Sequence, residues 1–307
     1  MGGYIGGSLA VRLKCLHNNF PQQTEGFRAG FGVQRTPSVP DEKLMCVMAI
    51  LYKTARNTPI LVAANREERV ERPTVAPKIQ SGKPRVVCGI DQQAGGTWLG
   101  VNQHGMLAAV TNRPKRVVPP DPRSRGLLCR ELLAISNAKE AAQWAASELA
   151  KERYDGANYL CADADYAAVV YGGDDVEIVA LPPGLHTISD GNLNDRRDPR
   201  QEFVRRTLTL HMLDSAVTFL AVGSQAFARK CDADGRRGVI LRDPRRPTVS
   251  STLLSLSDKI STCIYQYSPG PPCDHSYDDL SALLRQVLST DKARKAREEA
   301  GNHTKSR

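Results

Sequence analysis

The sequence lacks a long hydrophobic run. No stretch of about 18 consecutive apolar residues occurs, and a membrane-spanning helix needs a run of roughly that length. The opening residues, Met1-Gly2-Gly3-Tyr4-Ile5-Gly6, lack the hydroxyl residue of a myristoylation site, and their apolar run is too short for a secretory signal. We therefore expect a cytoplasmic protein with no membrane span.

Metal-binding patterns are also missing. The eight cysteines do not form the short paired spacings of zinc or thioredoxin-like motifs, and the six histidines have no metal-ligand spacing. Cys88 and Cys161 lie in apolar, strand-like runs, where a free cysteine packs as a small hydrophobic side chain. These absences predict no metal site and no cofactor, and they are typical of a reducing compartment.

The sequence has little that suggests a nucleic-acid partner, although its formal net charge is +9. Arginines and lysines are interspersed with acidic residues, and the basic cluster at 236–246 contains no aromatic residues. Gly95-Gly96 is followed by neither Lys-Ser/Thr nor a helix start, so it predicts a tight turn rather than a phosphate loop. We expect the charge to serve solubility.

The domain organisation follows from a change of pattern at Met45. Residues 1–44 have no helical or strand period, which predicts a disordered extension or a mis-assigned start. With 41% apolar and 24% charged residues, the composition is that of a globular protein. We expect a single domain over 45–290 and a basic flexible tail over 291–307.

Alternating and continuous apolar runs predict many short strands, and helical spacing predicts a few helices between them. Strands are expected at 45–52, 58–65, 85–90, 97–102, 106–111, 157–161, 167–171, 176–181, 184–189, 250–256 and 261–267. Helices are expected at 124–133, 138–151 and 277–288, with another that begins near Asp198-Pro199. Long runs of strands separated by paired helices indicate an α+β layered domain.

The most informative motif is Asn65-Arg66-Glu67-Glu68, at the end of an apolar strand. Alone, it also fits an arginine–glutamate network on the surface. Its order and spacing with other motifs make it specific: Met45-Cys46 precedes it, and it is followed by Gly95-Gly96-Thr97-Trp98-Leu99-Gly100, Thr111-Asn112-Arg113, Leu185-His186-Thr187-Ile188-Ser189-Asp190 and Thr248-Val249-Ser250-Ser251-Thr252.

From residue 45 to about 260, this series resembles the family named for its Asn-Arg-Asp-Glu motif, which includes the eukaryotic transport-and-Golgi-organisation proteins. That family is similar to the cysteine N-terminal-nucleophile hydrolases. The resemblance implies a four-layer αββα sandwich of antiparallel sheets. It also implies an amidohydrolase acting on a small acylated amide, with Cys46 as nucleophile, Arg66 lowering the thiol pKa, and Asn112 as an oxyanion donor.

The resemblance further implies a set of substrate-binding positions. These are Asn65, Glu67, Glu68, Trp98, Asp190 and Asn192. The second oxyanion asparagine falls at position 190, where this chain has aspartate, and an ionised carboxylate donates no hydrogen bond. Two alternatives follow: Asn192 or Asn194 replaces it after a loop shift, or amide hydrolysis is weak or absent.

An N-terminal nucleophile needs a free α-amine, which has a pKa of about 7.7–8.0 and accepts the thiol proton. Cys46 therefore requires either translation from Met45 with removal of that methionine, or cleavage after a propeptide. A competing hypothesis, which the eukaryotic relatives imply, is a non-catalytic protein that handles haem or an acyl lipid. The partner is then a small-molecule substrate or a hydrophobic ligand, and the oligomeric state is left open.

Overall fold

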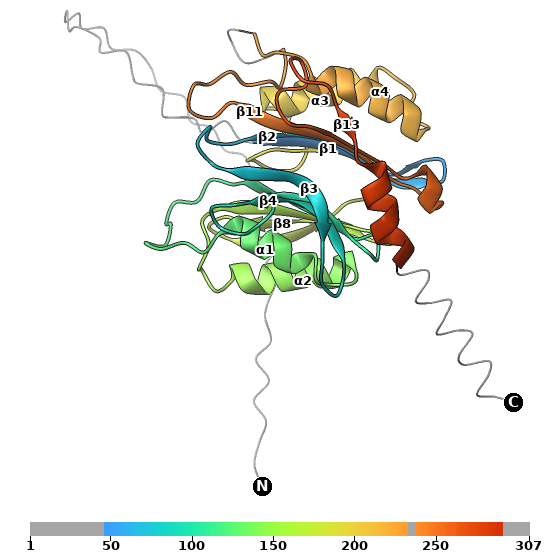
Figure 1. Cartoon of the computed structure of the whole chain (residues 1–307). Helices are drawn as coiled ribbons and strands as arrows, with labels where there is room; N and C mark the ends of the chain where they lie inside the picture. Colours follow the sequence, from blue (N-terminus) through green and yellow to red (C-terminus); the bar gives the residue numbers. More distant parts are fainter. Residues whose placement is uncertain (1–45, 233–236, 291–307) are drawn as a thin grey trace, which may run out of the picture. The chain divides into compact units, whose positions relative to one another are not determined.

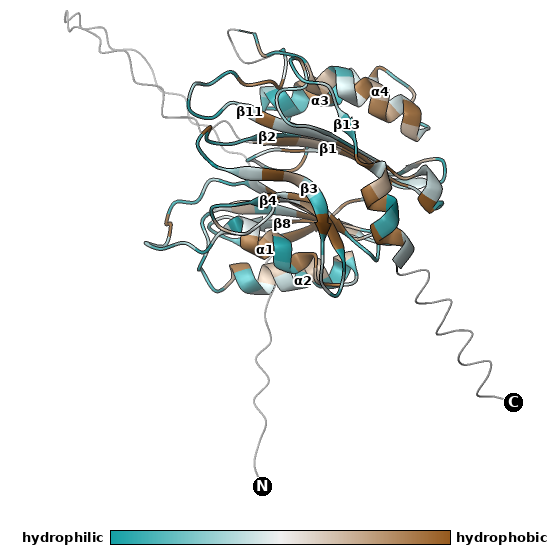
Figure 2. Ribbon diagram, in the orientation of Figure 1, coloured by the Kyte–Doolittle hydropathy of each residue, from teal (hydrophilic) through white to brown (hydrophobic). Residues whose placement is uncertain are grey.

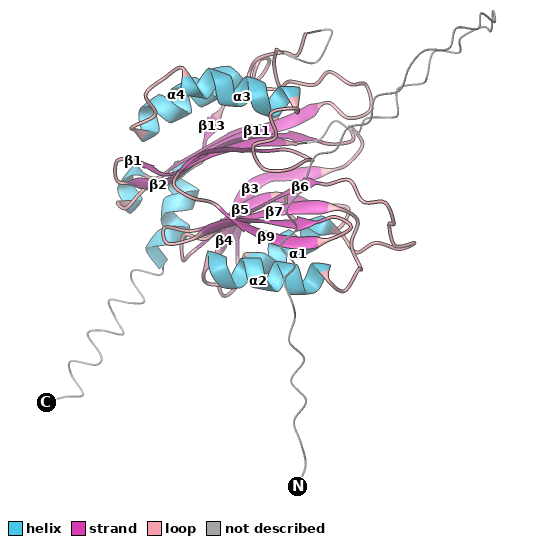
Figure 3. Ribbon diagram, turned by 180° about the vertical axis from the view of Figure 1, so that it is seen from behind, coloured by secondary structure: helices cyan, strands magenta, loops and turns pink. Residues whose placement is uncertain are grey.

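The computed structural model describes residues 46–232 and 237–290. In these residues, two antiparallel sheets lie face to face, and helices cover the outer face of each sheet (Figure 1; Figure 3). This confirms the expected four-layer αββα sandwich. The predictions for 1–44 and 291–307 fall outside the described residues, and the single domain over 45–290 stays a prediction.

The first sheet has six strands in the order β10-β1-β2-β11-β12-β13, and every neighbouring pair is antiparallel. Its strands are β1 (Val47–Ala55), β2 (Thr58–Glu67), β10 (Gly184–Ile188), β11 (Thr248–Leu256), β12 (Ile264–Ser268) and β13 (Asp278–Asp279). The central strands β1 and β2 come from the predicted N-terminal hairpin.

The second sheet has seven strands in simple sequence order, β3 to β9. Its strands are β3 (Thr74–Gln80), β4 (Val86–Asp91), β5 (Leu99–Asn102), β6 (Leu107–Asn112), β7 (Ala157–Ala162), β8 (Ala167–Gly172) and β9 (Val176–Ala180). The chain therefore builds this sheet as one meander, with a helical pair inserted between β6 and β7.

Two helical pairs form the outer layers (Figure 3). The pair on the seven-stranded sheet is α1 (Arg125–Leu132) and α2 (Ala138–Leu149), and the pair on the six-stranded sheet is α3 (Pro199–Thr209) and α4 (Ala216–Phe227). Residues 260–262 form a 3-10 turn, η1, and residues 281–290 form a further helix. None of the helices within the described ranges is both long and apolar enough to cross a membrane.

Local residues explain where the helices begin. Asn137 accepts a hydrogen bond from the Glu140 backbone N–H at 2.9 Å, which caps α2. Asp198 caps α3 in the same way, and Pro199 occupies its first turn, where a missing N–H carries no penalty. This is the helix start that the sequence predicted.

Both faces of β1 are buried, because the six-stranded sheet lies between a sheet and a helical layer. Met48, Ile50 and Tyr52 pack in the core between the two sheets. Val47, Ala49 and Leu51 pack against α3 and α4. Hydrophobic residues accordingly gather along the strands in Figure 2, while most loops are hydrophilic. Such double burial explains why the strand appears in the sequence as a continuous apolar run.

Several elements differ from expectation, and three of them have a local cause. β3 was not predicted, because Pro77 and Lys78 interrupt its pattern and it forms a sheet edge with a largely unburied side. α4 was not predicted either, since its β-branched residues and Gly223 have low helix propensity. The last helix begins at 281 rather than 277, where the Asp279 carboxylate accepts from the Ser281 N–H at 2.9 Å.

We predict that Gly89→Ala will destabilise the fold by about 1–3 kcal/mol, the usual range for overpacking a core. A Cβ at position 89 would lie 2.3 Å from Trp98 Cη2. Chemical denaturation measures the loss. Gly82→Ala is the matched control, because its Cβ would approach its nearest neighbour, the Pro84 carbonyl oxygen, only to 3.4 Å. Equal stability of the two variants would contradict the close packing of Trp98 on β4.

Candidate active site

The candidate nucleophile lies at the start of β1, beside the end of β2. Val47 pairs with Asn65 in the β1–β2 ladder, and the next position outward brings Cys46 opposite Arg66. Because side chains alternate along a strand, Cys46 lies on the same face as Met48, which packs between the sheets. The hairpin therefore places the thiol and the guanidinium together on the inner face of the six-stranded sheet.

A small cavity of about 20 Å³ lies at this point, with room for about one water molecule. Its walls include Cys46, Arg66, Trp98, Val110, Ser250 and Thr252. The Arg66 guanidinium lies over the Trp98 ring, 4.3 Å from its centroid. This cation–π contact joins the two sheets across the cavity, and such contacts contribute about 0.5–2 kcal/mol. Four of the predicted positions, 46, 65, 66 and 98, thus line one cavity.

The thiol is protonated in this environment. Burial raises the pKa of Cys46 to about 11, and the nearby Glu67 carboxylate adds to the rise. The contact of Cys46 Sγ with the Glu67 carbonyl oxygen, at 3.8 Å, and the positive charge of Arg66 lower the pKa, but by less. Arg66 thus lowers the pKa of Cys46 as expected, but desolvation outweighs the arginine and the net shift is upward.

A chain of charges holds Arg66 in place. Its Nη2 lies 3.4 Å from Glu68 Oε2, and the same carboxylate oxygen lies 3.7 Å from Arg72 Nε. Arg72 in turn forms a two-point contact with Asp91, at 3.1 and 2.6 Å. Glu68 therefore acts on Arg66 and does not line the cavity. The same carboxylate links the end of β2, through Arg72, to the end of β4.

Glu67 has its side chain on the opposite face of β2. Its Oε1 accepts from Thr248 Oγ1 at 2.9 Å and lies 3.3 Å from Arg200 Nη2, on α3. Burial raises the pKa of this carboxyl, and Arg200 only partly offsets the rise. Its Oε2 is buried and has no hydrogen-bond partner among the described residues. Asn65, on the same face, donates to the Phe227 carbonyl at 3.0 Å and so anchors α4.

Asp190 lies just beyond the end of β10, the strand that pairs with β1 on the side away from β2. The β1–β10 ladder ends at the pair Met48–Ile188, two residues before Asp190. Burial raises the pKa of Asp190, and the neighbouring Asp198 raises it further. Asp190 Oδ1 accepts from Ser189 Oγ at 3.2 Å. The position predicted for an oxyanion asparagine therefore holds a half-buried carboxyl, and it is not among the residues that line the Cys46 cavity.

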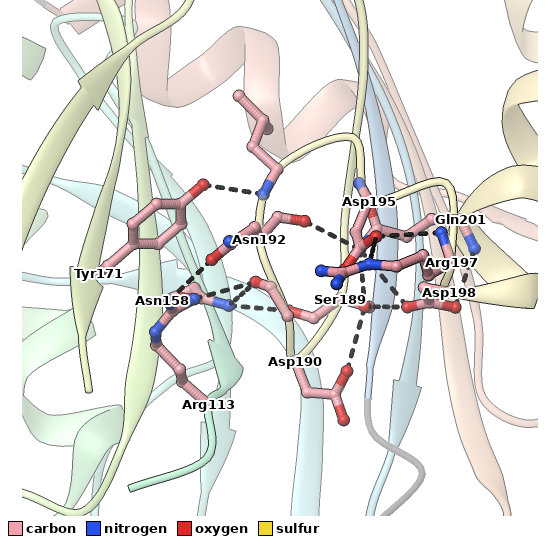
Figure 4. Close-up of polar contacts among 12 residues, drawn as sticks. Arg113, Asn158, Tyr171, Ser189, Asp190, Asn192, Asp195, Arg197, Asp198 and Gln201 are labelled. Carbon is pink, nitrogen blue, oxygen red and sulfur yellow. Dashed lines mark hydrogen bonds and ion pairs between the residues drawn. The ribbon is translucent and has the colours of Figure 1, made fainter. Parts of the chain in front are cut away.

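The loop that carries Asp190, residues 189–198, is held by three residues of the other sheet (Figure 4). Arg113 donates to Asn158 Oδ1 at 3.1 Å and to Asn192 Oδ1 at 2.8 Å, and its guanidinium stacks 4.2 Å from the Tyr171 ring centroid. Asn158 Nδ2 also donates to the Ser189 carbonyl at 2.9 Å. Asn192 is thus engaged in loop structure rather than in the cavity.

No pattern in the sequence singles out Asn158 or Tyr171. Arg113 lies within the Thr111-Asn112-Arg113 motif, but its role in fixing the 189–198 loop depends on a strand pairing that brings residues 78 positions apart into contact. Only a prediction of the full sheet order would have found this cluster.

Asn112 ends β6 and does not line the cavity. Thr111 faces the six-stranded sheet and donates to the Ser189 carbonyl at 2.6 Å, so strand alternation directs Asn112 to the other face. Asn194, the other alternative donor, accepts from the Thr187 N–H at 2.8 Å. Among the described contacts, the structure does not bring Asn112 or Asn194 to Cys46.

Comparison with known proteins identifies the family. The family model for Transport and Golgi organisation 2 matches residues 45–225, which is more than half of the chain. The chain belongs to this family. It is 30% identical over 142 residues to the Transport and Golgi organization 2 homolog of Mus musculus and 32% identical over 142 residues to that of Bos taurus. Each match covers 44% of this chain and 51% of the relative, so the chain spans about half the length of these relatives.

Solved structures share the layered arrangement at low sequence identity. Penicillin V acylase from Agrobacterium tumefaciens is 13% identical with a TM-score of 0.42, covering 72% of this chain and 82% of that one. A mutant of conjugated bile acid hydrolase from Clostridium perfringens is 11% identical with a TM-score of 0.47, covering 78% and 93%. The architecture described above rests on the sheets and helices of this chain itself.

We predict that alkylation of Cys46 by iodoacetamide will be slow at pH 7 and will accelerate about tenfold per pH unit towards pH 10, because only the thiolate reacts. Arg66→Leu will slow the reaction at each pH, since it removes a charge that lowers the thiol pKa. Peptide mapping by mass spectrometry measures the rate. Arg69→Leu is the control, and a pH-independent rate in the unmodified protein would disprove the raised pKa.

Proposed function

We propose that the protein is a cysteine amidohydrolase that cleaves the C–N bond of a small acylated amide, with Cys46 as the nucleophile. The observation that supports it best is the meeting of Cys46, Arg66 and Trp98 around one cavity at the start of β1. A thiol beside a fixed guanidinium can attack a carbonyl while the arginine holds a negatively charged group of the substrate.

The proposed reaction has two balanced steps. The α-amine of Cys46 takes the thiol proton, the sulfur bonds to the carbonyl carbon, and the C–N bond breaks as the leaving nitrogen takes the proton back. Water then attacks the resulting thioester, which gives a carboxylic acid and restores the thiol. The cavity holds about one water as it stands, so a substrate enters only when the Arg66–Trp98 stack opens.

The proposal requires that the peptide bond before Cys46 be absent in the active form. With that bond intact, the nitrogen is an amide without basicity, and the thiol pKa of about 11 leaves almost no thiolate at neutral pH. Glu67 supplies a suitable anchor for a freed ammonium group, because its buried Oε2 has no hydrogen-bond partner among the described residues. Glu67 already lies close enough to raise the pKa of Cys46.

Transition-state stabilisation is the weakest part of the site. Asn112 was the predicted oxyanion donor, but it does not line the cavity. Asp190 follows the end of β10, the strand beside β1, and can donate only when protonated, and its pKa is raised by burial. We therefore propose that Asp190 limits amide hydrolysis at neutral pH and that the protonated acid supplies the donor under acidic conditions.

A second candidate function is a carrier for a hydrophobic metabolite, such as haem or an acyl lipid. A larger cavity of about 310 Å³ favours it, because ligand pockets begin at about this size. The cavity lies between the sheets at the ends of the strands remote from Cys46, and its walls include Ile60, Leu256, Ile260 and Leu288. A carrier of this kind does not need the Cys46 thiol.

We predict that a chain beginning at Cys46, made by starting translation at Met45 and removing that methionine, will hydrolyse acyl-amide substrates and react with an amide-directed electrophilic probe. Mass spectrometry confirms the terminus, and release of amine measures the rate. Cys46→Ala will abolish both, whereas Cys88→Ala, a buried control thiol, will leave both unchanged. Full activity in a form that retains residues upstream of Cys46 would exclude the mechanism. The carrier function would be favoured if no hydrolysis occurs and Cys46→Ser leaves the binding of a hydrophobic ligand unchanged.

We predict that Asp190→Asn will raise kcat for amide hydrolysis at pH 7 by about 10²–10³-fold, the usual value of one oxyanion-hole donor. The asparagine amide donates at every pH, so the advantage of the variant over the unmodified enzyme will shrink as the pH falls and Asp190 becomes protonated. The pH profile of kcat distinguishes this from a change in stability. Asp195→Asn, in the same loop, is the control, and a fall in kcat for Asp190→Asn would contradict the assigned role.

A further inference from the structure

The segment between α3 and α4 presents an unusual concentration of exposed hydrophobic side chains. Leu210, Met212 and Val217 are 82%, 81% and 75% exposed, which makes them three of the four most exposed large hydrophobic residues described. They fall within eight consecutive residues, 210–217, here called the α3–α4 tip. Scattered exposed hydrophobic residues are ordinary, but a group of this kind on one loop marks an interaction surface.

The tip is held firmly enough to present these side chains outwards. Leu213, in its middle, packs on the core beneath α3 and α4. Ser215 caps α4 by accepting from the Thr218 N–H at 3.2 Å. Asp214 accepts from the Arg56 N–H at 2.9 Å, which ties the tip to the turn between β1 and β2. Leu210, Met212 and Val217 therefore face solvent while the backbone stays attached to the fold.

The same contact locates the tip relative to the candidate active site. Arg56 follows the last residue of β1, and Cys46 precedes the first residue of that strand. At about 3.3 Å per residue, the strand separates the two by about 30 Å. The turn is also joined to the next loop by the bond from the Asp258 N–H to the Asn57 carbonyl at 3.0 Å. The exposed group thus lies at the end of the sandwich remote from Cys46.

The surroundings of the tip carry charges of both signs, with basic side chains in slight excess. Arg56 is exposed, the exposed Lys53 donates to the Asp165 carbonyl at 2.9 Å, and the Arg206 side chain, 75% exposed, pairs with Glu202 at 2.6 Å. Asp214 is the acidic residue of the tip and directly precedes Ser215, the N-cap of α4. Protruding apolar side chains beside exposed cations match the interface of an anionic bilayer, where the apolar groups enter the acyl boundary and the cations meet phosphates.

We propose that the α3–α4 tip docks the protein on anionic lipid membranes, with Leu210, Met212 and Val217 inserted at the headgroup boundary. The opposite end, with Cys46, then points away from the lipid. Attachment of this kind is reversible, because three side chains and a few cations bind far more weakly than a spanning helix. The inference does not depend on the proposed hydrolase activity.

The test is co-sedimentation of the full chain with vesicles of phosphatidylcholine alone or mixed with phosphatidylserine. We expect binding to the mixed vesicles that weakens as salt is raised, because surface charges are screened. The triple variant Leu210→Ser, Met212→Ser, Val217→Ser will lose at least about tenfold in membrane partitioning, since burial of apolar area drives insertion. Circular dichroism and thermal unfolding verify that the variant is folded.

A double variant, Val117→Ser with Val118→Ser, is the matched control, because it removes exposed valines from a different loop. It will bind vesicles as the unmodified protein does. Three results would overturn the proposal: no binding by the unmodified protein, equal loss in both variants, or unchanged binding in the triple variant. Light scattering adds a fourth, because a dimer that the triple variant dissociates, without vesicle binding, would assign the tip to a second copy of the chain.

Discussion

The antiparallel pairing of β1 with β2 is the constraint on which the rest of the site depends. Its register brings Cys46 opposite Arg66, and strand alternation then divides the neighbouring residues between two different environments. Arg66 faces the other sheet and stacks on Trp98, whereas Glu67 faces the helical layer and pairs with Arg200. A shift of one residue would exchange these environments, so the buried charge on Glu67 helps to specify the register.

The two faces of the six-stranded sheet have different electrostatic consequences for the same thiol. On the inner face, Arg66 favours the thiolate; from the outer face, the Glu67 carboxylate opposes it. Burial adds the largest effect and decides the outcome, so Cys46 is a protonated thiol despite an adjacent arginine. A buried, protonated thiol can act as a nucleophile only if a base within hydrogen-bonding distance takes its proton. A freed α-amine on the same residue supplies that base without another side chain. In the proposed mechanism, the protonated thiol and the need for a free terminus therefore have one physical origin.

Most of the fold and about half of the site could be predicted from the sequence, for reasons that individual residues make clear. β1 and β2 were found because burial on both faces makes them continuous apolar runs, while β3 was missed because an edge strand with Pro77 and Lys78 has no such pattern. Arg66 and Trp98 lie around one cavity with Cys46, and each belongs to a local motif on a predicted strand. The remaining features of the site depend on contacts between segments that are distant in the sequence. Arg113, Asn158 and Tyr171 hold the 189–198 loop, and the sequence of the loop alone does not predict these contacts. The thiol pKa could not be predicted for the same reason, because desolvation is set by the packed structure around the residue.

The length of β1 has a further consequence for how the two ends of the molecule can operate. One end carries the Cys46 cavity and the charge chain through Glu68, Arg72 and Asp91; the other carries the turn that holds the α3–α4 tip. Both ends of the strand are fixed by hydrogen bonds to neighbouring elements, so the strand acts as a rigid spacer of about 30 Å. That distance exceeds the screening length of about 8 Å at physiological ionic strength. Charges gathered at the tip therefore leave the thiol pKa unaffected, and the surface at one end can change its partner without altering the chemistry at the other.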